Sequence, residues 1–247
     1  EYDRSDYLIS TKFTPQMADK DQPDSAMEKM LTESLQRLKT DYVDMYWIHN
    51  PADVELWTPQ LIPLVKSGKI KRVGVSNHNL AQIKRVEEIL AAADIKLAAI
   101  QNHYSLLYRS SEDAGILAYC KERAMAFYSY MVIEQGALTG RYNRQNPLPA
   151  GSDRAKNYNS QLAEIENLTQ LMAQIGQIHN ASVAEIATAW AISKGTLPII
   201  GLTKAKYIAS EQKATEVDLT AKEVKTLEEC AKTTKVDTQA VWEEAMI

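Results

Sequence analysis

The sequence predicts an α/β fold of parallel strands, and a barrel of the (β/α)8 (TIM) type fits it better than an open sheet. Six segments rich in β-branched and aromatic residues alternate with segments of helical periodicity, which is typical of right-handed βαβ units. No Gly-x-Gly-x-x-Gly motif follows any of them, which disfavours an open dinucleotide-binding sheet. A complete barrel has eight strands. We therefore expect one barrel domain over residues 1–247 that lacks roughly the first one or two βα units.

The first part of the chain contains three of the predicted strands. Residues 7–13, 42–49 and 69–75 each combine β-branched or aromatic side chains and run into a polar turn. A Ser-x-x-Glu capping box predicts a helix over residues 25–38, because apolar residues then recur at helical spacing. Residues 56–67 are predicted as a second helix that ends before a glycine.

The middle of the chain continues the same alternation. The pattern predicts a helix over residues 80–92 and a strand over residues 97–101. A helix over residues 111–123 and a strand over residues 125–129 follow. The next thirty residues or so, about 130–160, are polar and contain Pro and Gly, so they are predicted to form a loop.

The C-terminal part is predicted to be mainly helical. Residues 161–178 form a long helical pattern, and a capping box opens another over residues 182–193. Residues 196–200 are the sixth predicted strand, and a short helix is expected after Thr203. A third capping box opens the last predicted helix, over residues 220–233.

Composition narrows the class of protein. The chain is 45% hydrophobic and 24% charged, with a net charge of -4, so it has material for a large core and is not biased toward nucleic acid. No apolar run is long enough to cross a membrane, and the first residues do not form a signal peptide. Cys120 and Cys230 lack metal-ligand spacing, so we expect reduced thiols, no metal site and a cytoplasmic setting.

Polar and aromatic side chains follow every predicted strand. In a barrel of parallel strands the carboxyl ends meet at one rim, which is where such enzymes place their chemistry. A scaffold alone would not need polar groups at all six ends. The residues concerned are Lys12, His49, Ser76, Asn77, Gln101, Asn102, Tyr128, Ser129 and residues 201–204.

Lys12 and His49 each allow two interpretations. Lys12 is either a salt-bridged structural lysine or a charge that lowers the pKa of a neighbouring tyrosine so that it can act as an acid. His49 is either a hydrogen-bonded structural residue or a neutral imidazole that donates to a carbonyl oxygen. The two interpretations of Lys12 are about equally supported, and the position of Lys12 at the same rim favours the second interpretation of His49.

The other rim residues suggest a cofactor, with structural alternatives. The amides of Asn77 and Gln101 suit a carboxamide such as that of nicotinamide, although Ser76 and Asn77 would equally suit capping of the next helix. Tyr128 either stacks on a flat ring or packs in the core. Residues 201–204 precede a predicted helix, whose N-terminus would suit a phosphate.

Several of these segments resemble those of the aldo-keto reductase family. The matching segments are residues 9–13, 41–44 with 48–49, 68–77, 100–105, 136–142 and 198–201. The resemblance implies a barrel that binds NADP(H) in an extended form and reduces carbonyls to alcohols. It implies that Lys12 and His49 are the lysine and histidine of the Asp-Tyr-Lys-His catalytic tetrad. The Asp and Tyr have no match in this chain, and we expect them in the missing units that precede Lys12.

The resemblance also implies the cofactor contacts. Ser76, Asn77 and Gln101 match residues that bind the nicotinamide amide, and Tyr128 matches the ring that stacks on the nicotinamide. Residues matching the pyrophosphate and adenosine contacts are Met131, Gln135, Gly136, Gly201, Thr203, Lys204, Tyr207 and Glu211, of which Lys204 would favour NADPH over NADH. After Ser129 the family usually has proline, where this chain has Tyr130.

The resulting hypothesis is an NADPH-dependent oxidoreductase that acts on a small aldehyde or ketone. Trp57 and Trp242 would either wall an apolar substrate pocket or pack in the core. The alternative is an NADP(H)-binding barrel without catalysis, such as a regulatory subunit of the channel-β-subunit kind, or an inactive truncated form. An Asp and a Tyr upstream of Glu1 would discriminate between the two.

Overall fold

The computed structural model describes residues 3–240 and 243–246, apart from the side chain of Lys206. The chain divides into two compact units. The first consists of Glu1–Asn102, Ser111–Ala126 and Glu244–Ile247, and the second of His103–Ser110 and Phe127–Glu243. Each unit has its own buried apolar side chains, including Trp47 in the first and Trp190 in the second.

The strands of the first unit are parallel and lie in chain order, as predicted. They are β1 (Ser10–Phe13), β2 (Val43–Ile48), β3 (Ile70–Ser76) and β4 (Leu97–His103), whose last residue belongs to the second unit. Lys12 lies opposite Trp47, and Trp47 lies opposite Gly74. This register brings the carboxyl ends of neighbouring strands together.

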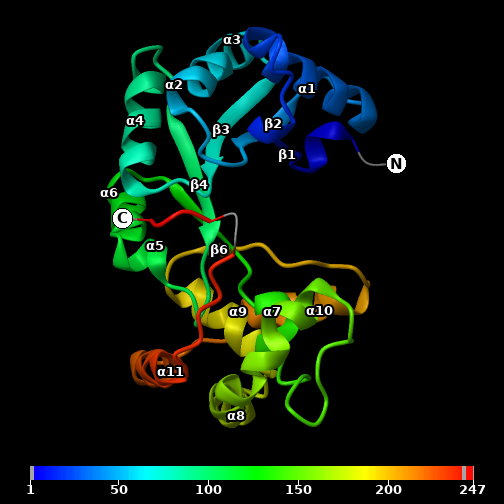
Figure 1. Cartoon of the computed structure of the whole chain (residues 1–247), viewed down its shortest axis with the longest axis vertical. Helices are drawn as coiled ribbons and strands as arrows, with labels where there is room; N and C mark the ends of the chain where they lie inside the picture. The colour runs from blue at the N-terminus through cyan, green and yellow to red at the C-terminus, as the bar shows by residue number, and fades with distance from the viewer. Residues whose placement is uncertain (1–2, 241–242, 247) are drawn as a thin grey trace. The chain divides into compact units, whose positions relative to one another are not determined.

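Helices lie in an arc along these strands (Figure 1). They are α1 (Pro23–Leu38), α2 (Val54–Trp57), α3 (Leu61–Lys66), α4 (Leu80–Ala91), α5 (Ser110–Asp113) and α6 (Ile116–Glu122), with 3-10 turns η1 (Arg4–Asp6), η2 (Pro15–Met17) and η3 (Thr58–Gln60). Apolar side chains of α1, α3 and α4 are buried, including Met27, Leu61 and Ile83. The helix–strand alternation predicted from the sequence is confirmed here.

The first strand is shorter than predicted. Tyr7 and Leu8 are exposed, and the backbone N–H of Ile9 donates to Asp44 Oδ2 at 2.8 Å instead of joining the strand ladder. Arg4 pairs with the same carboxylate at 2.7 Å. The N–H of Ile9 thus bonds a side chain, while its carbonyl oxygen accepts from the backbone N–H groups of Asp44 and Met45 at 2.9 and 3.1 Å.

The start of α1 differs from the prediction. The helix begins at Pro23, and Gln22 is its N-cap without a side-chain capping bond. The predicted capping box at Ser25 and Glu28 is therefore wrong. Proline suits the first helical position because its fixed φ fits a helix and its missing N–H would have no partner there.

Two helices predicted as continuous are interrupted. Residues 56–67 form parts of α2, η3 and α3, and Pro59 in η3 has no N–H to continue a regular helix. Residues 111–123 are divided between α5 and α6, where Gly115 takes the left-handed φ of 79°. Both interruptions thus occur at the residue types that are least compatible with a regular helix, a proline and a glycine.

The second unit contains two short parallel strands and the remaining described helices. The elements are β5 (Ala126–Tyr130, whose first residue belongs to the first unit), η4 (Glu134–Thr139), α7 (Asp153–Tyr158), η5 (Asn159–Gln161), α8 (Leu162–His179), α9 (Val183–Ser193), β6 (Leu197–Pro198), α10 (Lys206–Ala214) and α11 (Ala221–Thr234). Tyr128 of β5 lies opposite Leu197 of β6. The α8 helix packs against α9 and α11, and Trp190 of α9 stacks on Tyr104 with 5.1 Å between ring centroids.

The capping boxes predicted in this unit are confirmed. The hydroxyls of Ser182 and Thr220 accept from the N–H groups of Glu185 and Glu223, and each glutamate carboxylate accepts from the N–H of its N-cap residue. The loop predicted over residues 130–160 is wrong in part, because it contains η4 and α7. The sixth strand has two residues rather than the predicted five, residues 196–200.

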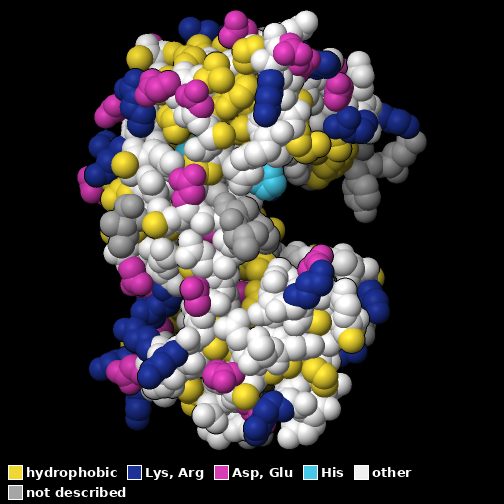
Figure 2. All heavy atoms as spheres, viewed as in Figure 1, with side chains coloured by type: hydrophobic (Ala, Val, Ile, Leu, Met, Phe, Trp, Pro, Cys, Tyr) yellow, Lys and Arg dark blue, Asp and Glu magenta, His cyan; other side chains and the backbone are white. Residues whose placement is uncertain are grey.

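The surface is mixed in charge. On the face in Figure 2, basic and acidic side chains are interspersed, and neither kind covers a continuous area. Among the described residues, no helix combines the length and the apolar character that crossing a bilayer would require.

Candidate active site

Lys12 and His49 lie at the ends of neighbouring strands. His49 directly follows β2, and its backbone N–H donates to the carbonyl oxygen of Phe13 at 2.8 Å. Burial lowers the pKa of His49, and so does the positive charge of Lys12. Burial also lowers the pKa of Lys12. The two side chains therefore share one partly buried environment, as the sequence predicts.

Hydrogen bonds fix the orientation of His49. Its Nδ1 lies 3.2 Å from the hydroxyl of Thr14, and its carbonyl oxygen accepts a bond of 2.9 Å from the amide of Asn77. When Thr14 donates to Nδ1, the neutral ring carries its proton on Nε2. The lowered pKa favours the neutral ring at pH 7, and in this tautomer Nε2–H is available as a donor. The predicted site did not include Thr14, although it follows Lys12 by only two residues.

Ser76, Asn77 and Gln101 lie at the ends of β3 and β4. Ser76 is opposite Gln101, and the Asn77 N–H donates to the carbonyl oxygen of Gln101 at 3.1 Å. Asn77 has a left-handed φ of 63°, which asparagine tolerates better than most residues. All three side chains are buried. The predicted rim residues of the first unit are thus brought together.

The alternative role of Ser76 and Asn77 as helix caps is excluded. Asn79 is the N-cap of α4: its side-chain oxygen accepts from the Gln82 N–H at 2.9 Å, and Gln82 Oε1 accepts from the Asn79 N–H at 2.8 Å. The Asn77 amide instead donates to the His49 carbonyl and, at 3.2 Å, to Asn50 Oδ1. Asn77 therefore connects the ends of β2 and β3.

Gly74 makes room for the indole ring of Trp47 on the neighbouring strand. Trp47 lies directly opposite both Lys12 and Gly74, and its indole N–H donates to Ser10 Oγ at 2.6 Å. A Cβ at Gly74 would overlap the ring of Trp47 and approach the carbonyl oxygen of Ala99. Only glycine allows this close packing between the strand and the ring.

We predict that Gly74→Ala lowers the free energy of unfolding by about 1–3 kcal/mol, because Trp47 must move to make room for a methyl group. Urea unfolding measures the change. Gly201→Ala is the matched control, since no atom lies within 4 Å of a Cβ built there. Equal stability of the two variants would contradict this account of Gly74.

In the second unit, three predicted cofactor residues lie in one unusual turn, the β5 turn (residues 131–136). Met131, Glu134, Gln135 and Gly136 all have positive φ, of 62°, 46°, 51° and 107°. At Gly136 a Cβ would lie 3.3 Å from the ring of Tyr142, so φ and space both favour glycine. Tyr128, on the strand that precedes this turn, is half-buried.

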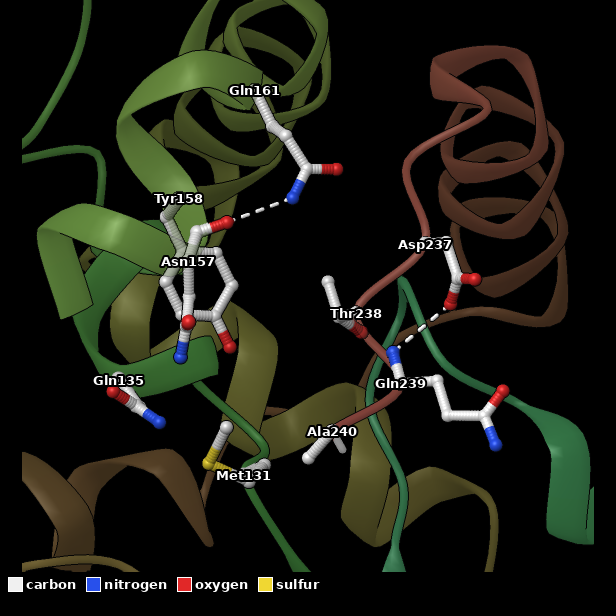
Figure 3. A pocket seen from close by; sticks show the side chains of 9 residues that line it. All are labelled: Met131, Gln135, Asn157, Tyr158, Gln161, Asp237, Thr238, Gln239 and Ala240. Carbon is white, nitrogen blue, oxygen red and sulfur yellow. Dashed lines mark hydrogen bonds between the residues drawn. The ribbon is translucent and has the colours of Figure 1, made fainter. Parts of the chain in front are cut away.

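The β5 turn borders a small pocket of about 140 Å³ (Figure 3). The lining residues are Met131, Gln135, Asn157, Tyr158, Gln161, Asp237, Thr238, Gln239 and Ala240. The first two belong to the turn, the next three to α7 and η5, and the last four to the segment after α11. Most of these side chains carry a polar group, whereas Met131 and Ala240 are apolar.

The remaining predicted cofactor residues lie before and within α10. Gly201, Thr203 and Lys204 are exposed and precede the helix, whereas Tyr207 and Glu211 are on it. Glu211 Oε2 accepts a bond of 3.2 Å from the Thr188 hydroxyl, and burial raises the pKa of this carboxyl group.

The two predicted substrate-pocket tryptophans differ in what the structure describes. Trp57 is 7% exposed and packs against Phe13 with 4.9 Å between ring centroids. Its role in a substrate pocket stays a prediction. Trp242 lies outside the described residues. Within those residues, no three His, Cys, Asp or Glu side chains are grouped in a way that could hold a metal ion.

Comparison with known proteins gives a consistent result. The model of the aldo/keto reductase family matches residues 1–232. The aldo-keto reductase yakc [NADP(+)] of Schizosaccharomyces pombe is 28% identical, over 94% of this chain and 72% of that protein. The NADPH-dependent alpha-keto amide reductase of Saccharomyces cerevisiae is 26% identical, over 91% of this chain and 65% of that protein.

Solved structures agree with the fold. The thermostable aldo-keto reductase Tm1743 superposes with a TM-score of 0.72 at 23% identity. The match covers 93% of this chain and 73% of the Tm1743 chain. The glycerol dehydrogenase AKR11B4 from Gluconobacter oxydans has a TM-score of 0.77 at 22% identity. That match covers 90% of this chain and 68% of the dehydrogenase chain. These similarities confirm the predicted fold class, α/β with the (β/α)8 barrel as its type.

Proposed function

We propose that this chain, which belongs to the aldo/keto reductase family, is an NADPH-dependent oxidoreductase that reduces aldehydes or ketones to alcohols. The observation that carries the proposal is the pairing of Lys12 with His49 at adjacent strand ends, where the lysine charge acts on the imidazole. The names of two relatives, an NADP(+) aldo-keto reductase and an NADPH-dependent reductase, support the choice of cofactor. We also propose that residues 1–247 belong to a single barrel domain.

The residues of the chain fit a nicotinamide cofactor. Two buried side-chain amides, Asn77 and Gln101, complement a carboxamide. The left-handed β5 turn ends in Gly136, where a side chain would meet Tyr142. Lys204 is exposed and offers a positive charge for a phosphate. When bound, NADPH supplies the hydride for the carbonyl carbon.

We assign each predicted contact by its match to the family. Ser76, Asn77 and Gln101 would hold the nicotinamide amide, and Tyr128 would stack on the ring. The residues assigned to the pyrophosphate and adenosine phosphates are Met131, Gln135, Gly136, Gly201, Thr203, Lys204, Tyr207 and Glu211.

His49 and Lys12 have separate roles in the proposed reaction. His49, neutral at pH 7 because its pKa is lowered, donates from Nε2–H to the carbonyl oxygen and orients the substrate. Lys12 stabilises the phenolate of the tetrad tyrosine and so lowers the pKa of that proton donor. The matched motifs support this assignment of the lysine and the histidine and leave the tetrad acid and tyrosine unassigned.

The partner and location follow from the same proposal. The substrate is a small-molecule carbonyl compound rather than nucleic acid, since the net charge is -4 and the surface in Figure 2 mixes both signs. Cys120 and Cys230 are free thiols, which is compatible with a reducing cytoplasmic setting.

The test combines cofactor binding with turnover. We predict that the purified protein binds NADPH saturably and consumes it only when an aldehyde or ketone is added, with formation of the alcohol. Titration by fluorescence and product analysis measure these two properties. Binding without turnover across a broad carbonyl panel would favour the regulatory alternative. Failure to bind NADPH would contradict both functions.

A further inference from the structure

A fully buried histidine in the second unit lies between two carboxylates. His103 Nε2 is 3.0 Å from Glu134 Oε1, and His103 Nδ1 is 3.0 Å from Glu243 Oε1. Both glutamates are also buried. Because both ring nitrogens face carboxylate oxygens, the doubly protonated imidazolium is the form that satisfies both bonds.

Two tyrosine rings enclose this imidazole. Tyr108 stacks on His103 with 4.3 Å between ring centroids, and Tyr130 stacks on it at 5.5 Å. The Tyr130 hydroxyl also donates to Glu243 Oε1 at 2.6 Å. The faces of aromatic rings favour a cation, so the enclosure supports the charged form of His103. Tyr130 stands where the family usually has proline, and this chain uses it in the network.

Glu134 is the anchor of the β5 turn. Its Oε1 accepts bonds from the hydroxyls of Ser105 and, at 3.1 Å, Thr238, and its Oε2 accepts a bond of 2.6 Å from the Tyr158 hydroxyl. Glu134 itself has a left-handed φ of 46°. A left-handed conformation is unfavourable for residues other than glycine, so it persists where surrounding contacts fix it. The buried carboxylate supplies those contacts.

The C-terminal tail (residues 235–240 and 243) supplies the other half of the network. Thr238 bonds Glu134, and Glu243 bonds His103. Glu243 also accepts a bond of 2.9 Å from the backbone N–H of Ala240, which closes the tail on itself. In Figure 3 the tail lines the pocket together with Met131 and Gln135 of the β5 turn.

We propose that His103 is a positioning residue for the cofactor, because its ring, held between Glu134 and Glu243, fastens the C-terminal tail to the β5 turn. This inference rests on the proposed function, since Met131, Gln135 and Gly136 of that turn are the assigned cofactor contacts. The tail keeps the turn in its left-handed conformation before the cofactor arrives. Loosening the tail therefore weakens cofactor binding without changing the groups that carry out the reaction.

Two nearly isosteric variants test the network. Thr238→Val removes the bond between the tail and Glu134, and Glu243→Gln removes the charge that faces His103 while keeping the shape of the side chain. Thr233→Val is the matched control, since its exposed hydroxyl donates to the nearby Cys230 carbonyl at 2.7 Å and, among the described residues, takes no part in the network. The measurements are amide hydrogen exchange without cofactor, the NADPH dissociation constant, and kcat.

Both network variants are expected to speed exchange in residues 131–136 and to raise the NADPH dissociation constant about tenfold, with kcat within about twofold of wild type. The control should change none of these quantities. Unchanged exchange in the β5 turn of both variants would overturn the proposal. So would faster exchange with an unchanged dissociation constant. If wild-type protein shows the protected turn yet binds no NADPH, the proposed function fails instead.

Discussion

Replacing Lys12 with methionine is expected to lower kcat about 10³-fold while the NADPH dissociation constant stays within about threefold of wild type. Methionine has a similar length and removes the ammonium group with its charge and its N–H donors. Without the ammonium group, the tetrad tyrosine regains a pKa near its ordinary value of about 10 and donates its proton poorly at pH 7. Steady-state kinetics with an aldehyde and a fluorescence titration with NADPH measure the two quantities.

The same variant gives a second, independent signal at His49. The charge of Lys12 contributes to the lowered pKa of His49, so its removal should raise that pKa toward the value set by burial alone. NMR titration of the imidazole measures this shift. Lys71→Met is the matched control, because Lys71 is exposed on β3 and its ammonium contacts the Tyr42 ring at 4.8 Å. A Lys12→Met enzyme with more than about a tenth of the wild-type kcat would contradict the assigned role.

The site residues of the first unit could be predicted because the end of a strand can be recognised in the sequence. Lys12 and His49 each follow a run of β-branched and aromatic residues, and parallel pairing in chain order then brings consecutive ends together. The role of Asn77, in contrast, could not be decided from the sequence alone. Its amide is equally suited to capping a helix, and only the position of Asn79 as the actual cap resolves the ambiguity.

Local patterns failed where two signals competed. Ser25 and Glu28 form a capping-box sequence, yet Pro23 starts the helix earlier because a proline is accommodated best at the first position. Residues 130–160 contain proline and glycine, and the N-cap Ser152 of α7 lies directly behind such a stretch. Proline and glycine, which interrupt helices and strands, can thus also lie just before the start of a helix such as α7.

The buried network of His103, Glu134 and Glu243 could not be predicted from local sequence patterns. His103 and Glu243 are 140 residues apart in the sequence, and His103 and Glu134 are 31 apart. No spacing rule connects residues at such separations, and each residue alone suggests only a solvent-exposed charge. Even the left-handed turn at Glu134 is hidden, because glutamate carries no preference for that conformation.

The stability of the protein is expected to fall as pH rises from about 7 to about 10, and His103 is the source of the effect. The carboxylates of Glu134 and Glu243 act against burial and raise the pKa of His103 from 6.5 to about 9. A folded-state pKa above the unfolded value stabilises the fold fully below about pH 6.5, and the contribution disappears as pH rises through about 9. The difference is on the order of 3 kcal/mol in the free energy of unfolding.

Titration of Tyr108, Tyr158 and Glu243 does not produce this pH dependence. Burial raises the pKa of Tyr108 and of Tyr158, and nearby glutamates raise both further, so these hydroxyls stay neutral in this range. Despite its burial, the pKa of Glu243 is lowered by hydrogen bonds and by the charge of His103. Its contribution is present above its unfolded pKa and is lost only in acid.

Urea unfolding of wild type and His103→Gln across this pH range isolates the contribution. The glutamine variant should be less stable by about 3 kcal/mol at pH 7, and the two curves should converge by about pH 10, because wild type has then lost the charge that the variant never had. His179→Gln is the control, since it removes the half-buried partner of Glu223 and should leave the alkaline slope intact. Parallel curves would contradict the assignment. If His103→Gln does not fold, NMR titration of His103 in wild type decides the matter, and a pKa below 7 would refute the buried imidazolium.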